Sequence, residues 1–158
     1  VFADPVNELL QVLPENGGVV DLQPLFFRFT LDVTTAFLFG ESIHSLQSTG
    51  KVQEKDFASA FDLAQKYIIK RFRLLELYWL IGGSEFHGAC RAVHNFADEI
   101  IERNLSSRSD EQNTNNRKYY LLRSVAEASP DRASLRGQII SLLVAGRDTT
   151  SCLLSWTL

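Results

Sequence analysis

A short segment near the end of the chain places charged and hydroxyl side chains inside an otherwise apolar run. Within "IISLLVAGRDTTSCLLSW", residues 139–156, the centre holds Gly146, Arg147, Asp148, Thr149 and Thr150. A carboxylate beside a hydroxyl is suited to delivering protons to a bound group. The flanking apolar residues predict a long buried helix, so this chemistry would lie within a core element.

Two different faces emerge when this segment is placed on a helix at about 100° per residue. One face is rich in leucine and is expected to pack against protein; it carries Leu142, Leu143, Gly146, Thr150, Leu153 and Leu154. The opposite face carries mainly small side chains around the carboxylate and hydroxyl: Ser141, Val144, Ala145, Asp148, Thr149 and Cys152. Small side chains there leave room for a group that is not protein.

The backbone at the centre of this helix is a predicted weak point. Gly146 costs a helix up to about 1 kcal/mol relative to alanine. Thr149 can turn its hydroxyl back to the carbonyl of Ala145, and such a bond often bends a helix. A loosened turn can admit water. The pattern alone also allows the alternative that "RDTTS" is an ordinary exposed turn of a helix.

Helical periodicity continues through nearly the whole chain, and no sustained alternation predicts a strand. Asp4 and Pro5 are expected to start the first helix, and Asp21 and Gly40 to bound the second. Further helices are expected around 57–72, 86–105 and 119–128, and the last from about residue 134, capped by Ser129 or Asp131. The connection 106–118 is polar. The fold class expected is all-α.

Composition limits the possible functions. The chain has 158 residues, 45% of them hydrophobic, and a net charge of −3, with no motif for binding nucleic acid. Two cysteines are too few for a disulfide framework. No segment has the ~20 mostly apolar residues that a transmembrane helix needs. The chain begins with Val1 and its last helix has no stop signal, so we expect a piece from the middle of a larger protein.

Two other groups of residues have a structural interpretation. His87, Cys90 and His94 share a helical face, but no fourth ligand is near in sequence, so no metal site is predicted. Asp32 is expected to pair with Arg28, one helical turn earlier.

The segment "AGRDTTSCLLSW" resembles the oxygen-activation motif of the cytochrome P-450 superfamily. Ala145, Gly146, Asp148, Thr149 and Thr150 all match that pattern. Three more segments are similar to the same family: "DLQPLFFRFTLDVTTAFLFGESI", "FDLAQKYIIKRFRL" and "FHGACRAVHNFADEII". The nearest resemblance is to the fungal group that hydroxylates n-alkanes and fatty acids.

The resemblance implies a haem-thiolate monooxygenase that inserts one oxygen atom from O2 into a hydrophobic, long-chain aliphatic substrate. Asp148 and Thr149 would be catalytic and assist proton delivery to dioxygen. Ala145, Gly146 and Thr149 would lie against the haem, and Ser141, Val144 and Ala145 would face the substrate. Electrons would come from NADPH through the flavins of an NADPH-cytochrome reductase.

The resemblance also implies what the chain does not contain. The family holds its iron with a cysteine in a glycine-rich loop near the C-terminus, and neither Cys90 nor Cys152 has that setting. Residues 1–158 are therefore expected to form a partial cytochrome P-450 domain. They would lack the N-terminal anchor and the haem-ligand region, and end within the long distal helix. The isolated chain is expected to be inactive.

The location implied for the parent protein is the endoplasmic reticulum membrane. A basic cluster, Lys66, Lys70, Arg71 and Arg73, precedes "LLELYWLIGG", and this region either touches the membrane or is a solvated helix face. The competing function is a non-enzymatic helical interaction module.

Overall fold

The chain folds as an assembly of helices, which confirms the all-α class expected from the sequence. The computed structural model describes all residues except 1, 15, 41, 48–51, 107–119 and 130, and no strand occurs in the part described. The elements are α1 (Ala3–Val12), α2 (Leu22–Phe39), α3 (Val52–Arg73), the 3-10 helix η1 (Leu75–Leu80), α4 (Ser84–Ser106), α5 (Tyr120–Ala128) and α6 (Arg132–Thr157). The polar connection expected at 106–118 falls almost entirely outside the described residues.

Local capping explains where the helices start and stop. Asp21 accepts a hydrogen bond from the backbone N–H of Gln23 at the start of α2, and Gly40 ends that helix with φ +73°. Both caps confirm the prediction. Asp131, rather than Ser129, caps α6 by accepting from the Ser134 N–H.

The first helix starts earlier than Asp4 and Pro5 predicted. Phe2 is its N-cap and makes no side-chain capping bond, while the helix proper begins at Ala3. Pro5 therefore lies within the first turn. A proline is tolerated there because the first N–H groups of a helix have no partner inside it.

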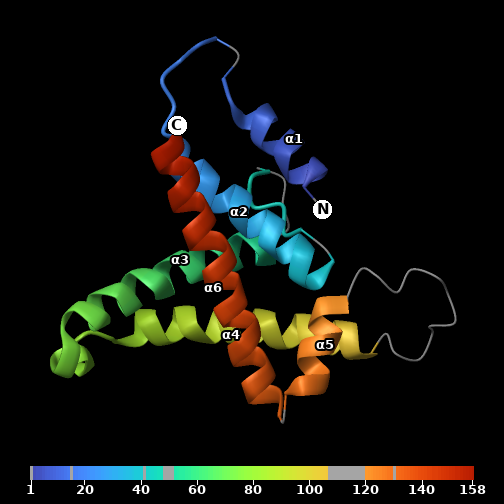
Figure 1. The fold of residues 1–158 in the computed structure, drawn as a ribbon. Helices are drawn as coiled ribbons and strands as arrows, with labels where there is room; N and C mark the ends of the chain where they lie inside the picture. Colours follow the sequence, from blue (N-terminus) through green and yellow to red (C-terminus); the bar gives the residue numbers. More distant parts are fainter. Residues whose placement is uncertain (1, 15, 41, 48–51, 107–119, 130) are drawn as a thin grey trace, which may run out of the picture.

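The long helix α6 organises the molecule (Figure 1). Helix α2 packs along its second half, and α3 and α4 form an antiparallel pair that α6 crosses. Helix α5 sits beside the first turns of α6, and α1 packs on α2. Where α6 crosses α2, hydrogen bonds join residues that are 117 and 120 positions apart in the sequence.

The apolar core lies where these helices meet. Its members are Leu31, Leu38, Phe39, Ile43, Phe57, Phe61, Val93, Ile100, Ile101, Leu122, Leu135, Ile139 and Leu143. Phe57 stacks on Phe96 with ring centroids 3.9 Å apart, which joins α3 to α4. The apolar stripe of α3 is only partly buried, because Ile68 and Phe72 near its end are exposed.

A buried carboxylate fixes the segment that follows α2. Asp32 is fully buried, and its oxygens accept from the backbone N–H groups of Ser45 (2.8 Å) and Leu46 (3.2 Å). The ion pair expected with Arg28 is therefore wrong; the carboxylate faces inward, toward the returning chain. Burial raises the pKa of Asp32, and the two N–H bonds act in the opposite direction.

Candidate functional site

The turn of α6 that carries Asp148 and Thr149 has the local bond expected from the sequence. The Thr149 hydroxyl donates to the Ala145 carbonyl at 2.7 Å. The helix nevertheless runs without a break from Arg132 to Thr157, so the expected loosened turn is not observed. The exposed Thr149 oxygen keeps its acceptor lone pairs for a further partner.

The face of small residues on α6 is uncovered. Ser141, Val144, Ala145, Thr149 and Cys152 are exposed, and Asp148 is half-buried. The side chains of α6 on this face are small, so they do not block the approach of a flat, non-protein group. Contact with a haem or a substrate at these residues stays a prediction.

The packing face of α6 differs from the one expected. Its buried residues follow a strict four-residue spacing: Leu135, Ile139, Leu143, Arg147 and Ser151. Leu142, Thr150 and Leu153 are exposed. The other helices pack against α6 along this four-residue row, so most residues on its other sides are partly or fully exposed.

Gly146 lies on α6 directly beside Thr34 of α2. A Cβ atom at this position would come within 2.8 Å of the Thr34 hydroxyl oxygen and 2.9 Å of the Thr34 methyl carbon. The absence of a side chain therefore allows the two helices to pack. Haem contact at Gly146 remains a prediction alongside this structural role.

Arg147 is buried at the centre of the packing face, with only 4% of its surface exposed. Its guanidinium lies 4.9 Å from the Phe27 ring centroid and 5.3 Å from that of Phe61. It also pairs with Asp62, and its Nε donates to the Phe27 carbonyl at 3.3 Å. Aromatic faces and several acceptors make burial of this charge tolerable.

A second set of contacts connects Arg147 to the candidate acid. Arg147 Nη1 donates to Gln65 Oε1 at 2.8 Å and to Asp148 Oδ1 at 3.3 Å, and Gln65 Nε2 donates to Asp148 Oδ2 at 2.8 Å. The sequence alone predicts no role for either Arg147 or Gln65. The signal that the sequence did contain is the four-residue spacing that places Arg147 on the same row as Ile139 and Leu143.

Thr30 of α2 adds a hydrogen bond at the same crossing. Its hydroxyl oxygen lies 3.0 Å from the Arg147 carbonyl oxygen and 2.8 Å from the Phe26 carbonyl oxygen, so its single hydrogen is shared between the two acceptors. The polar centre of α6 is thus held from α2 as well as from α3.

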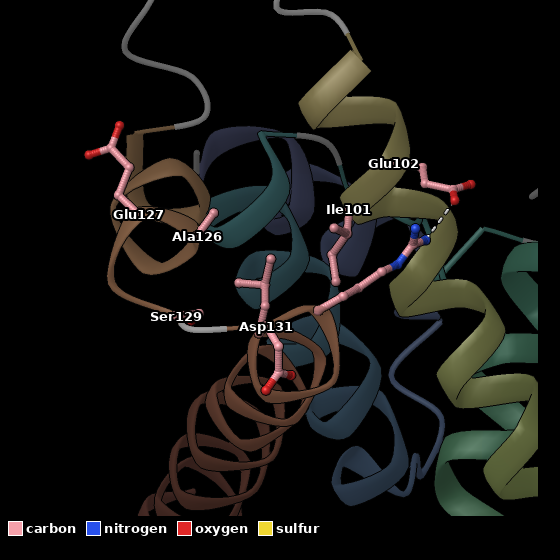
Figure 2. Close-up of a pocket in the computed structure, with 8 residues that line it drawn as sticks. Ile101, Glu102, Ala126, Glu127, Ser129 and Asp131 are labelled. Carbon is pink, nitrogen blue, oxygen red and sulfur yellow. Dashed lines mark ion pairs between the residues drawn. The ribbon is translucent and has the colours of Figure 1, made fainter.

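Pockets also occur elsewhere in the described structure, and two of them are large enough to compare with the predicted site. One lies between α4, α5 and the start of α6, has a volume of about 400 Å³, and contains an ion pair between Glu102 and Arg132 (Figure 2). The other, about 370 Å³, lies at the end of α3 and includes Phe72, Tyr78 and Phe86. Neither includes the residues that the sequence proposed for the site.

The helical face with His87, Cys90 and His94 has no metal-binding arrangement. Among the described residues, no three His, Cys, Asp or Glu side chains come close enough together to hold a metal ion. Both histidines are exposed, and burial raises the pKa of the Cys90 thiol.

Comparison with known proteins identifies the family to which this chain belongs. The family model for cytochrome P450 matches residues 2–158. A cytochrome P450 of Arthroderma benhamiae is 43% identical over 97% of this chain and 31% of its own length. Cytochrome P450 52A10 of Candida maltosa is 40% identical, again over 97% of this chain and 31% of its own. Cytochrome P450 52A8 of Candida tropicalis is 36% identical over 97% of this chain and 32% of its own.

These relatives are fungal, as the resemblance predicted, and the match extends along nearly the whole sequence. The chain spans about a third of the length of the curated relatives it matches. Taken with the helical fold and the motif on α6, the match shows that this chain belongs to the cytochrome P450 family.

Proposed function

We propose that the full-length protein is a haem-thiolate monooxygenase that inserts one oxygen atom from O2 into a hydrophobic substrate. Family membership supports the reaction class. The observation that carries the proposal is the position of Asp148 and Thr149 on α6, next to an exposed face of small residues. A face with this composition suits a planar cofactor and a reacting molecule.

Haem would lie against Ala145, Gly146 and Thr149, with its iron ligand supplied by another part of the protein. When bound, the thiolate-ligated haem supplies the redox chemistry that cleaves the O–O bond. The residues of this chain would transfer protons and exclude bulk water. Thr149 Oγ1 donates to the Ala145 carbonyl and so presents lone pairs that can hold a water molecule.

Asp148 would supply protons to the water or hydroxyl at Thr149. Its carboxylate is half-buried, held on one side by Gln65 and Arg147, and retains lone-pair positions for water. A carboxylate with partial access to solvent can be reprotonated after each transfer. This arrangement supports a relay from solvent through Asp148 to the hydroxyl.

The substrate would contact Ser141, Val144 and Ala145, which are exposed on the same helix face. Their small size favours a slender molecule over a branched one. A long aliphatic chain is the substrate class that the fungal resemblance suggests. Electrons would reach the haem from NADPH through a flavin-containing reductase.

The tip formed by α3 and η1 supports a location at a membrane, and the endoplasmic reticulum is the membrane we propose. Five exposed apolar or aromatic residues gather on η1: Leu75, Leu77, Tyr78, Trp79 and Leu80. Basic residues at the end of α3 adjoin them, as at the headgroup level of a bilayer. Within the described residues, none of the helices meets the length and hydropathy needed to cross a bilayer.

The carbon monoxide difference spectrum of the reduced full-length protein tests the proposed function. We expect the absorbance band of a thiolate-ligated haem. A full-length, folded protein that binds no haem would contradict the proposal and support the helical interaction module instead.

A further inference from the structure

The side-chain amide of Gln65 connects α3 to both charged residues of the α6 motif. Its oxygen accepts from Arg147 Nη1 at 2.8 Å, and its nitrogen donates to Asp148 Oδ2 at 2.8 Å. Gln65 lies outside the motif, 83 residues before Asp148 in sequence. The bridge therefore depends on how α3 packs across α6.

Only one orientation of this amide satisfies both partners. A guanidinium offers only donors and an ionised carboxylate offers only acceptors. Turning the amide over would place its NH2 group against Arg147 and its oxygen against Asp148, which makes two repulsive contacts. The two charged residues thus fix the amide orientation, and the amide in turn fixes the carboxylate.

The partner on the other side of Gln65 is rigid. Arg147 is held by Asp62, by the Phe27 carbonyl, and between the rings of Phe27 and Phe61. Asp148 itself is less constrained, because its bond to Arg147 is longer, at 3.3 Å, and 34% of its side chain is exposed. Its shorter bond is the one from Gln65.

We propose that Gln65 is a positioning residue that orients the Asp148 carboxylate for proton transfer toward Thr149. The inference rests on the proposed function and extends it to a residue of α3. Gln65 does not touch the reacting atoms. It reduces the number of rotamers open to Asp148 and leaves the remaining lone pairs directed away from α3.

Two substitutions in the full-length protein distinguish a Gln65 that orients Asp148 from one that only binds Arg147. Gln65→Glu keeps an acceptor for Arg147, and the added charge strengthens that bond. The same change replaces the donor to Asp148 with a second carboxylate. Gln65→Leu removes both bonds.

If Gln65 positions Asp148, both variants should lower the product formed per NADPH by about tenfold, the low end for losing a group that orients a reactive residue. The solvent deuterium isotope effect on turnover should rise, while the substrate dissociation constant should not change. A Gln65→Glu variant with normal coupling and a normal isotope effect would overturn the inference, because a bridge to Arg147 alone would then suffice.

A stability measurement tests the contact without turnover. In a double-mutant cycle of Gln65→Leu and Asp148→Ala, the loss in Tm of the double variant should be smaller than the sum of the single losses. Lys66→Leu is the matched control, since Lys66 is the exposed neighbour on α3, and its effect should add to that of Asp148→Ala. Additive losses for Gln65 and Asp148 would overturn the contact.

The outcomes distinguish this inference from the function on which it rests. A protein without haem overturns both. An Asp148→Asn variant with unchanged proton delivery overturns the relay and the role of Gln65, while a thiolate-ligated haem in that protein would still support the monooxygenase. An Asp148→Asn variant that loses coupling while Gln65→Glu retains it overturns only the role of Gln65.

Discussion

Arg147 is the residue that joins three helices at the centre of the molecule. It lies on α6, pairs with Asp62 of α3 and donates to the Phe27 carbonyl of α2. Because only 4% of the surface of Arg147 is exposed, its partners would be left poorly solvated if the side chain were removed. Asp62 is the exception, since about half of its side chain reaches solvent.

Replacing Arg147 with alanine should lower the free energy of unfolding of the full-length protein by about 2 to 3 kcal/mol. The loss is below the extreme for a buried ion pair because Asp62 can regain water. Urea denaturation measures the effect. Arg103→Ala is the control: Arg103 pairs with Glu99 on the surface of α4, and its loss should cost at most about 1 kcal/mol. Equal losses for the two variants would contradict the role given to Arg147.

Asp148 gives a prediction on kinetics at the same scale. Asp148→Asn should lower kcat by about 100-fold, the contribution of a single proton-transfer group, with little change in substrate binding. Steady-state turnover and substrate titration of the full-length protein measure the two quantities. Asp131→Asn, at the capping position of α6, should leave both unchanged. A variant of Asp148 that loses only affinity would argue against a proton relay.

At the scale of elements, the crossing of α2 and α6 depends on a missing side chain. Thr34 occupies the space where a Cβ of residue 146 would lie. The four-residue row of α6 can therefore approach α2 closely only with glycine at this position. Gly137 provides a comparison on the same helix, because a Cβ there would meet nothing within 4 Å.

Gly146→Ala should destabilise the protein by about 1 to 3 kcal/mol, since overpacking outweighs the gain in helix propensity. Thr34→Ala in the same protein should recover most of the loss, because it removes the two Thr34 atoms nearest to the new Cβ. Gly137→Ala should instead stabilise by up to about 1 kcal/mol. Thermal unfolding of these three variants and of the unsubstituted protein measures the effects, and a Gly146→Ala protein as stable as the Gly137→Ala one would refute the close contact.

The elements also show which local features a sequence can predict. Asp21 and Gly40 act through their own backbone neighbourhood, so their capping roles were predictable. The Thr149 bond to Ala145 is local in the same sense. Asp32 was mispredicted because its partners, Ser45 and Leu46, come from a segment that folds back, whereas Arg28 was the only opposite charge at helical spacing.

At the scale of the whole molecule, the helix faces that depend on tertiary packing were the least predictable. Periodicity correctly predicts that α6 is a helix, but it also places Leu142 and Leu153 on the leucine-rich packing face, and both are exposed. The network of Arg147 and Gln65 requires α3 to cross α6, and no spacing within one segment reveals that crossing. The family resemblance supplied the candidate residues, whereas the structure supplied their partners.

The exposed tip of η1 leads to a prediction for the intact protein. In a protein whose exposed Cys152 is replaced by serine, a polarity-sensitive dye attached through Trp79→Cys should shift its emission to the blue when phospholipid vesicles are added, because the tip would enter the apolar layer. The same dye attached through Glu99→Cys, on an exposed position of α4, should show no shift. No shift at position 79 would contradict the membrane contact.

The central claim is that the Asp148 and Thr149 side of α6 borders the place where dioxygen is activated. The most direct measurement is the ratio of hydrogen peroxide to hydroxylated product in full-length Thr149→Ala, at fixed NADPH consumption. The account predicts normal haem content and substrate binding, with product yield reduced by about tenfold or more and peroxide increased to match. A Thr149→Ala protein that couples NADPH to product as well as the unsubstituted one would contradict the account.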